Sequence, residues 1–229
     1  MILGPHIRAV YFDAVGTVLH PHPSPFEVYA AAARENGLVL EIPVIRERFL
    51  AAFAREEARD RDAGWITSEA REFERWRTIV TTTLHEARDP LACFEHLWNH
   101  YAQPHAWRVD PSVTELLTFL TSQGIVLGLA SNLDGRLRSV VEKLPEMHRF
   151  HTRLAISSEV GYRKPSRQFF ETLLRHDGLA PHQMLYVGDD RTNDYDGARA
   201  AGMEAWLIDS HDRHPHIPHR VRSLGELLG

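Results

Sequence analysis

Cysteine is nearly absent from this chain, since Cys93 is the one cysteine among 229 residues. No disulfide can form within the chain, and a lone cysteine among apolar neighbours is typically a small core residue. The sequence also lacks an apolar run near the ~20 residues of a membrane-spanning helix, so we expect no membrane partner. The first residues show no signal-peptide pattern, which favours a cytoplasmic location.

Basic residues are not clustered, and the net charge is −5, so we expect no nucleic acid as a partner. Lysine is scarce: only Lys143 and Lys164 occur, and the other 24 of the 26 basic residues are arginine. The hydrophobic fraction of 43% and the charged fraction of 25% are ordinary for a globular protein. The length allows one large domain, or one domain with an insertion.

The segment that organises the chain lies near its start. Val10-Tyr11-Phe12 is an apolar run typical of a buried strand, and it ends at Asp13, before a Gly16-Thr17 turn. In open α/β sheets, ligands bind at the carboxyl edge of the strands. Asp13 is therefore either a turn or helix-capping acid, or a functional carboxylate at that edge.

Residues 20–104 are predicted to be helical. Ser24, Pro25 and Glu27 form a capping box that begins a helix through about residue 36, and no strand-like alternation follows before about residue 104. The aromatic side chains here either face a substrate or form the core of this block, and their periodic placement favours the core. The periodic positions are Ile45, Phe49, Phe53, Phe73, Trp76, Val80, Leu84, Leu91, Phe94, Leu97, Trp98 and Tyr101.

Beyond Trp107, helices and strands alternate with short connections. The predicted helices cover 113–122, 137–144, 167–176 and 196–201, and the predicted strands cover 125–130, 154–156, 184–187 and 205–208. This alternation predicts an α/β fold, a Rossmann-like parallel sheet with helices on both faces. We expect residues 1–19 and 105–229 to form this core domain, and residues 20–104 to form an α-helical cap inserted after the first strand. Near the end, four histidines between 211 and 219 stand among prolines, which favours a solvated loop over a metal site.

Three later strand ends carry polar groups. Ser131 and Asn132 offer a hydroxyl and an amide that can donate to an anion. Lys164 stands before Pro165, in a chain that otherwise prefers arginine, and a compact ammonium suits a phosphate. Asp189 and Asp194 follow the strand at 184–187, and such acids suit Mg²⁺.

Taken in order, these motifs resemble those of the haloacid dehalogenase-like hydrolase superfamily, in the branch with a helical cap after the first motif. The motifs are DxxGT at 13–17, Ser131-Asn132, lysine before proline at 164–165, and GDD…ND at 188–194. The resemblance covers essentially the whole chain, and four motifs together are far more specific than one. It implies an Mg²⁺-dependent hydrolase, phosphatase-like, that acts on a small phosphorylated substrate through an aspartyl phosphate.

The resemblance also implies roles for individual residues. Asp13, the nucleophile, and Lys164 are the expected catalytic residues. Asp13, Asp189, Asp194 and the main-chain carbonyl of Val15 are expected to bind Mg²⁺. The phosphoryl oxygens are assigned to Gly16, Thr17, Ser131, Asn132 and Lys164.

Val15 departs from the family pattern. Family phosphatases carry a second aspartate there, which protonates the leaving group and then activates water, and valine can do neither. Related phosphoryl-transfer pumps carry threonine at this position, which implies that a good leaving group needs no acid. We therefore keep open a second hypothesis, a weak or inactive member that binds a phosphorylated ligand or a protein partner.

Two other branches also lack this aspartate. The phosphonate-cleaving branch uses a lysine in its cap, but residues 20–105 contain none. The dehalogenase branch carries tyrosine at this position and uses no metal, so it would not require Asp189 and Asp194. The sequence leaves the oligomeric state and the identity of the substrate open.

Overall fold

The strand predicted before Asp13 is β1 (Ala9–Phe12), and it lies inside a six-stranded sheet. The computed structural model describes residues 3–228, so residues 1, 2 and 229, the ends of the predicted core domain, lie outside the described part. The sheet order is β5-β4-β1-β6-β7-β8, and each neighbouring pair is parallel. The other strands are β4 (Val126–Ser131), β5 (Leu154–Ile156), β6 (Met184–Gly188), β7 (Glu204–Ile208) and β8 (Arg220–Val221).

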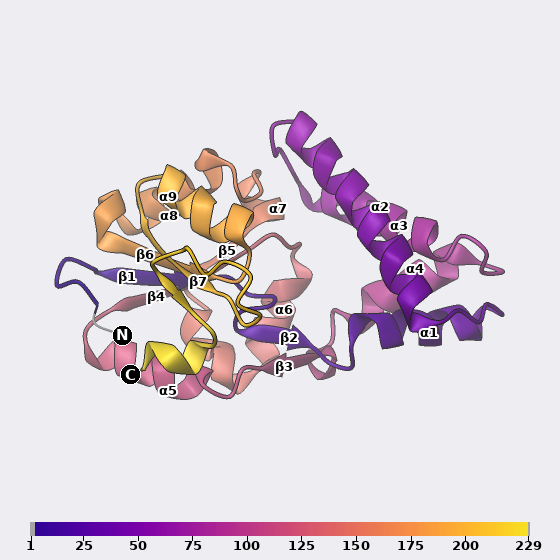
Figure 1. The fold of residues 1–229 in the computed structure, drawn as a ribbon, viewed down its shortest axis with the longest axis horizontal. Coiled ribbons are helices and arrows are strands. Elements are labelled where there is room, and N and C mark those ends of the chain that lie inside the picture. The colour runs from indigo at the N-terminus through magenta and orange to yellow at the C-terminus, as the bar shows by residue number, and fades with distance from the viewer. Residues whose placement is uncertain (1–2, 229) are drawn as a thin grey trace.

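Helices cover both faces of this sheet, as predicted (Figure 1). Val10 and Phe12 pack into one hydrophobic core with α5 (Val113–Ser122) and α6 (Arg136–Lys143). Ala9 and Tyr11 point into a second core with α8 (Arg167–Asp177) and α9 (Gly197–Ala200). Successive side chains of a strand point to opposite faces, so β1 is apolar throughout because both of its faces are buried. The short helix α7 (Ser157–Val160) follows β5.

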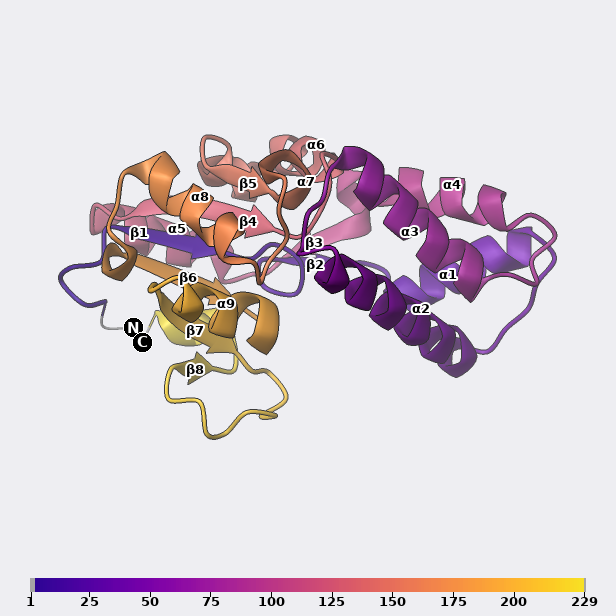
Figure 2. The same ribbon diagram turned by 90° about the horizontal axis from the view of Figure 1, so that it is seen from above.

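Four helices form a separate bundle beside the sheet (Figure 2). They are α1 (Pro25–Glu35), α2 (Ile42–Asp62), α3 (Glu69–Thr83) and α4 (Pro90–His100). The capping box at Ser24 and the side chain of Asp89, which accepts from two main-chain N–H groups, begin α1 and α4. The bundle has its own hydrophobic core, in which Cys93 is buried as predicted.

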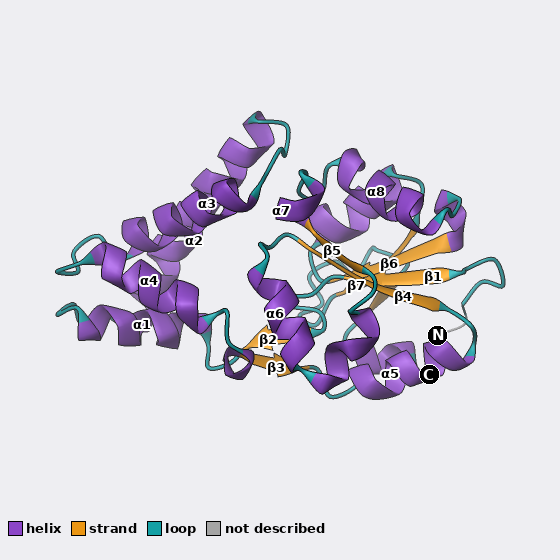
Figure 3. Cartoon of the chain, turned by 180° about the vertical axis from the view of Figure 1, so that it is seen from behind, coloured by secondary structure: helices purple, strands orange, loops and turns teal. Residues whose placement is uncertain are grey.

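The chain enters and leaves this helical bundle through a two-stranded antiparallel ribbon (Figure 3). β2 (Leu19–Pro21) pairs with β3 (Trp107–Val109), with Leu19 opposite Val109. The predicted boundary between residues 19 and 20 therefore falls inside β2. The boundary at 104–105 falls in the 3₁₀ turn Pro104–Ala106, just before β3.

The loop predicted around the four histidines connects β7 to β8, and three of them, His211, His216 and His219, are exposed. Between residues 3 and 228, no helix is both long and apolar enough to cross a membrane.

Candidate active site

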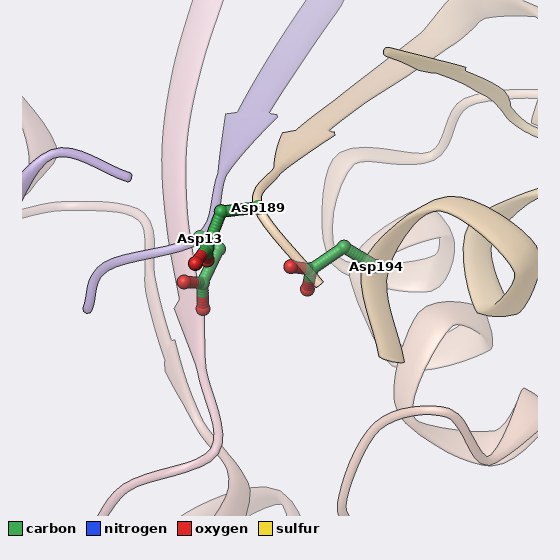
Figure 4. A group of neighbouring side chains, drawn as sticks. All are labelled: Asp13, Asp189 and Asp194. Carbon is green, nitrogen blue, oxygen red and sulfur yellow. The ribbon is translucent and has the colours of Figure 1, made fainter. Parts of the chain in front are cut away.

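The strand-end carboxylates converge at the carboxyl edge of the sheet (Figure 4). Asp13 follows β1, Asp189 follows β6, and Asp194 stands on the helical turn Arg191–Asp196. One carboxylate oxygen from each lies within 4.8 Å of the others. We call these three residues the acid cluster.

Two glycines allow the acids to approach one another. Gly16 has a φ of +96°, and a Cβ there would collide with the carboxylate of Asp189. A Cβ on Gly188 would collide with Asp194. Only a residue without a side chain fits such positions, so both glycines are required by the packing of the acid cluster.

Asp190 fixes the turn that carries Asp194. Its side chain accepts from the N–H groups of Thr192 and Asn193, each at 2.8 Å. Its own N–H donates to Asp194 Oδ2 at 3.0 Å. Asp190 thus acts as the N-cap of the turn and orients the third carboxylate.

Lys164 is buried between two of the acids. Its Nζ donates to Asp13 Oδ1 and to Asp194 Oδ1, each at 2.6 Å, and to the Tyr186 hydroxyl at 2.9 Å. Burial alone would lower the pKa of the Lys164 ammonium, but Asp13 and Asp194 outweigh burial and raise that pKa well above its usual value. Lys164 is therefore charged whenever the site is intact.

The residue that holds the backbone of Lys164 is Asn132. Its side-chain oxygen accepts from the Lys164 N–H at 2.8 Å, and its amide donates to the Lys164 carbonyl at 2.9 Å. The sequence predicts Asn132 as a phosphate ligand, whereas here its amide is bound to the main chain of Lys164. Ser131 lines the same cavity, while the Thr17 hydroxyl donates to Asp189 Oδ1 at 3.4 Å.

Negative charge exceeds positive charge in this site. Burial, followed by the charges of Asp194 and Asp189, raises the pKa of Asp13 above its usual value, although Lys164 opposes the shift. The Asp189 side chain still reaches solvent, but loss of hydration and then repulsion from Asp194 raise its pKa to about 7. Three carboxylates thus share the single ammonium of Lys164. A bound cation would offset the remaining negative charge.

The donor set fits Mg²⁺. It consists of carboxylate oxygens, which are the hard ligands that this ion prefers, and it leaves coordination positions for water and a substrate phosphate. Among groups of three or more His, Cys, Asp and Glu side chains in residues 3–228, the acid cluster is the one whose ligand atoms lie close enough together to hold a metal. The histidines between 211 and 219 do not form such a group.

A cavity of about 360 Å³ runs from the acid cluster to the helical bundle. Val15 lines this cavity at the end nearest the sheet. Within residues 3–228, Gly16 and Thr17, which the sequence predicts to bind the phosphoryl oxygens, are not among the lining residues. Bundle side chains form the far wall; these include Tyr29, Phe49, Phe53, Trp76, Phe94, Trp98 and Tyr101. The sequence prediction that these rings belong to the core of the bundle is thus half right, because they pack together and also face the cavity.

A buried ionic cluster joins α3 to the residue before Lys164. Arg163 pairs with Glu72, and its main-chain N–H donates to the Trp65 carbonyl at 2.8 Å. Arg75 pairs with Asp60 at 2.9 Å, and all four charged side chains are buried. Sequence reasoning missed this cluster, although a glutamate and an arginine three residues apart on α3, both on its apolar face, are an available signal.

Tyr186 is a second residue that sequence reasoning missed. It lies on β6, and its hydroxyl accepts from Lys164 and donates to the Ala130 carbonyl at 3.0 Å. A buried tyrosine hydroxyl generally has a hydrogen-bond partner, so a tyrosine inside an apolar strand, three residues before Asp189, is the signal that was present.

Comparison with known proteins agrees with this geometry. The family described as haloacid dehalogenase-like hydrolase matches residues 7–202. The chain is 28% identical to human haloacid dehalogenase-like hydrolase domain-containing protein 3 over 209 residues, covering 88% of this chain and 82% of the relative. It is 29% identical to glyceraldehyde 3-phosphate phosphatase from Methanothermobacter thermautotrophicus over 208 residues, covering 89% of this chain and 86% of that protein.

A solved L-2-haloacid dehalogenase from Xanthobacter autotrophicus has the same fold. Its TM-score is 0.72, with 15% identity and 96% of each chain covered. At that identity the likeness concerns the fold and not the reaction. The match to residues 7–202, together with the strand-end motifs brought into one site, shows that the chain belongs to the haloacid dehalogenase-like hydrolase family.

Proposed function

We propose that this hydrolase is an Mg²⁺-dependent phosphatase of small phosphorylated metabolites that forms an aspartyl phosphate on Asp13. The observation that carries the proposal is the acid cluster, with Lys164 bound to two of its members, at one end of the cavity. Phosphoryl transfer of this kind uses a carboxylate nucleophile, an ammonium that offsets charge on the phosphate, and oxygen ligands for a hard metal ion.

The chain's own residues divide the work as follows. An oxygen of Asp13 attacks phosphorus, and Lys164 offsets charge on the phosphoryl oxygens while it holds Asp13 in place at 2.6 Å. Ser131 is positioned on the cavity wall to donate to the same oxygens. Asn132 and Tyr186 act indirectly, by fixing the main chain and the ammonium of Lys164. When bound by Asp13, Asp189, Asp194 and the Val15 carbonyl, Mg²⁺ supplies further positive charge for the phosphoryl group.

Val15 limits the range of leaving groups. General acid–base assistance is worth about 10²–10⁴-fold, and a valine side chain offers none. An acyl phosphate leaves without a proton, so we expect it to react faster than an alkyl phosphate. Hydrolysis of the aspartyl phosphate is expected to be slow for the same reason.

A relative supports phosphatase activity over dehalogenation. One relative, described above, is named for phosphatase activity on glyceraldehyde 3-phosphate. A dehalogenase that uses no metal would have no use for Asp189 and Asp194 beside the nucleophile. A cytoplasmic location and the lack of nucleic-acid and membrane partners stay predictions from the sequence.

Val15 is also the observation that favours a second candidate function. A member without acid–base assistance would serve as a weak or inactive enzyme that binds a phosphorylated ligand or a protein partner. Such a protein would show ligand affinity without turnover.

The test is phosphate release from acetyl phosphate and from glyceraldehyde 3-phosphate, with and without Mg²⁺, for the natural protein and Asp13→Asn. We expect Mg²⁺-dependent turnover of acetyl phosphate, little turnover of the sugar phosphate, and none in the variant. Equal release by both proteins would overturn the proposed chemistry. Binding of either compound without any release would establish the second candidate instead.

A further inference from the structure

We propose that this site takes the monophosphate of an aromatic hydroxyl compound. The proposal rests on the phosphatase function above and names its substrate class. It draws on the walls of the cavity and on the missing acid at position 15.

The walls favour a flat apolar body. Successive rings of the bundle lie edge to face or tilted along the cavity, with Phe49 and Phe53 centred 5.8 Å apart and Phe53 and Trp76 6.4 Å apart. A volume of about 360 Å³ is at the small end of ligand pockets and holds one ring with a phosphate. An aromatic ligand gains offset or edge contacts with such rings beyond the burial of its area.

The cations on these walls are already paired. Arg136 donates to Asp134 Oδ1 at 2.7 Å and to the Trp98 carbonyl at 3.0 Å, and its guanidinium lies 3.4 Å from the centre of the Trp98 ring. Arg75 donates to Glu57 at 2.6 Å. Each hydroxyl of a sugar would need a partner when buried here, and these paired groups offer few. The lining therefore disfavours a polyol body.

Val15 favours a leaving group that departs without a proton. Asp13 attacks phosphorus, the bond between phosphorus and the aryl oxygen breaks, and the electron pair stays on that oxygen as a phenolate. Water supplies the proton of the released phenol, and a second attack by water on phosphorus frees Asp13 and inorganic phosphate. A phenol has a pKa near 10, so its anion leaves without a general acid far more readily than an alkoxide does.

The experiment compares four phosphates that separate shape from leaving group. Phenyl phosphate is flat with a good leaving group, benzyl phosphate is flat with a poor one, acetyl phosphate is small with a good one, and glycerol 3-phosphate is small with a poor one. We expect kcat/KM for phenyl phosphate to exceed that for benzyl phosphate by about 100-fold or more. We expect KM for phenyl phosphate to be at least about tenfold below KM for acetyl phosphate.

The outcomes separate this inference from the proposed function. Turnover of acetyl phosphate with no preference for phenyl over glycerol phosphate would overturn the substrate class and leave the phosphatase intact. If no compound is hydrolysed, the phosphatase proposal fails, and fluorescence titration of the cavity tryptophans decides the ligand class. Equal binding of phenyl phosphate and glycerol 3-phosphate would then overturn the inference as well.

Discussion

Val15 contributes an aliphatic side chain to the cavity wall that Asp13, the proposed nucleophile, also lines. We expect Val15→Asp to raise kcat/KM for glyceraldehyde 3-phosphate by about 10²–10⁴-fold, because the new carboxyl can protonate an alkoxide leaving group. The gain for acetyl phosphate should be much smaller. In the control variant Val15→Asn, asparagine has nearly the same shape as aspartate but no acidic proton. An equal gain in kcat/KM for this variant would show that acid catalysis is not the cause.

A single hydroxyl on β6 positions the lysine. Tyr186→Phe removes a hydrogen bond to a charged group, and we expect kcat with acetyl phosphate to fall about tenfold while KM changes little. Tyr11→Phe is a matched control, because Tyr11 pairs with Tyr186 in the sheet register but its hydroxyl donates to Asp177. A similar loss of kcat in both variants would mean that the effect is structural.

Single residues also show how far sequence can predict this site. The positions of Asp13, Lys164, Asp189 and Asp194 follow from the sequence, because parallel strands bring their carboxyl ends to one edge. The hydrogen-bond partner of Asn132 does not follow from the sequence, because a side-chain amide at that edge can reach a phosphate or a nearby main chain equally well. Only the loop that carries Lys164 decides between them.

At the scale of elements, the ionic cluster ties α3 to the loop that carries Lys164. Glu72→Gln should lower the free energy of unfolding by about 3 kcal/mol, because it leaves Arg163 buried without its closest counter-charge. Urea unfolding followed by circular dichroism measures the change. Glu74→Gln, on the exposed face of the same helix and paired with Arg77, should have a much smaller effect.

The outcome that contradicts this assignment is equal stability of the two glutamine variants. Glu72 would then contribute no more than a solvent-exposed partner does, and the cluster would not hold the bundle to the sheet domain. The same pair of variants should differ in protease sensitivity near the β2–β3 ribbon if the cluster closes the cavity.

Long periodic elements were predictable, and short ones were not. The helix predicted over 113–122 is α5 with the same bounds, because its apolar face and length leave little ambiguity. β8 spans two residues, Arg220–Val221, and carries no periodicity to detect. The aromatic rings of the bundle would follow a helical period both as core residues and as cavity-lining residues. The period alone therefore does not reveal that they also face a cavity.

At the scale of the whole molecule, the acid cluster makes stability depend on pH. The pKa of Asp189 rises from 3.8 to about 7 on folding, so the unfolded chain loses this proton first as pH increases. The folded state then binds more protons, and the free energy of unfolding falls between about pH 4 and pH 7. Thermal unfolding without Mg²⁺ should show this fall, and Asp189→Asn should reduce it.

Added Mg²⁺ should counteract this loss. The ion binds the deprotonated carboxylates of the folded state, so the rise in Tm on adding Mg²⁺ should be larger at pH 8 than at pH 5. Ca²⁺, which is larger and takes more ligands, is a useful comparison. An identical rise at both pH values, or in Asp189→Asn, would mean that the ion acts elsewhere.

The β2–β3 ribbon makes the helical bundle, topologically, the loop of a β-hairpin. Leu19 and Val109 face each other across an antiparallel pair, where partner Cα atoms stand about 5 Å apart. Along the chain, the insert is therefore joined to the α/β unit at two neighbouring points, and the pair of Arg163 with Glu72 adds a contact in space. Among the described residues, neither core of the α/β unit contains a bundle residue, so the insert can diverge without loss of the strand-end chemistry wherever it does not contact the loop that carries Lys164.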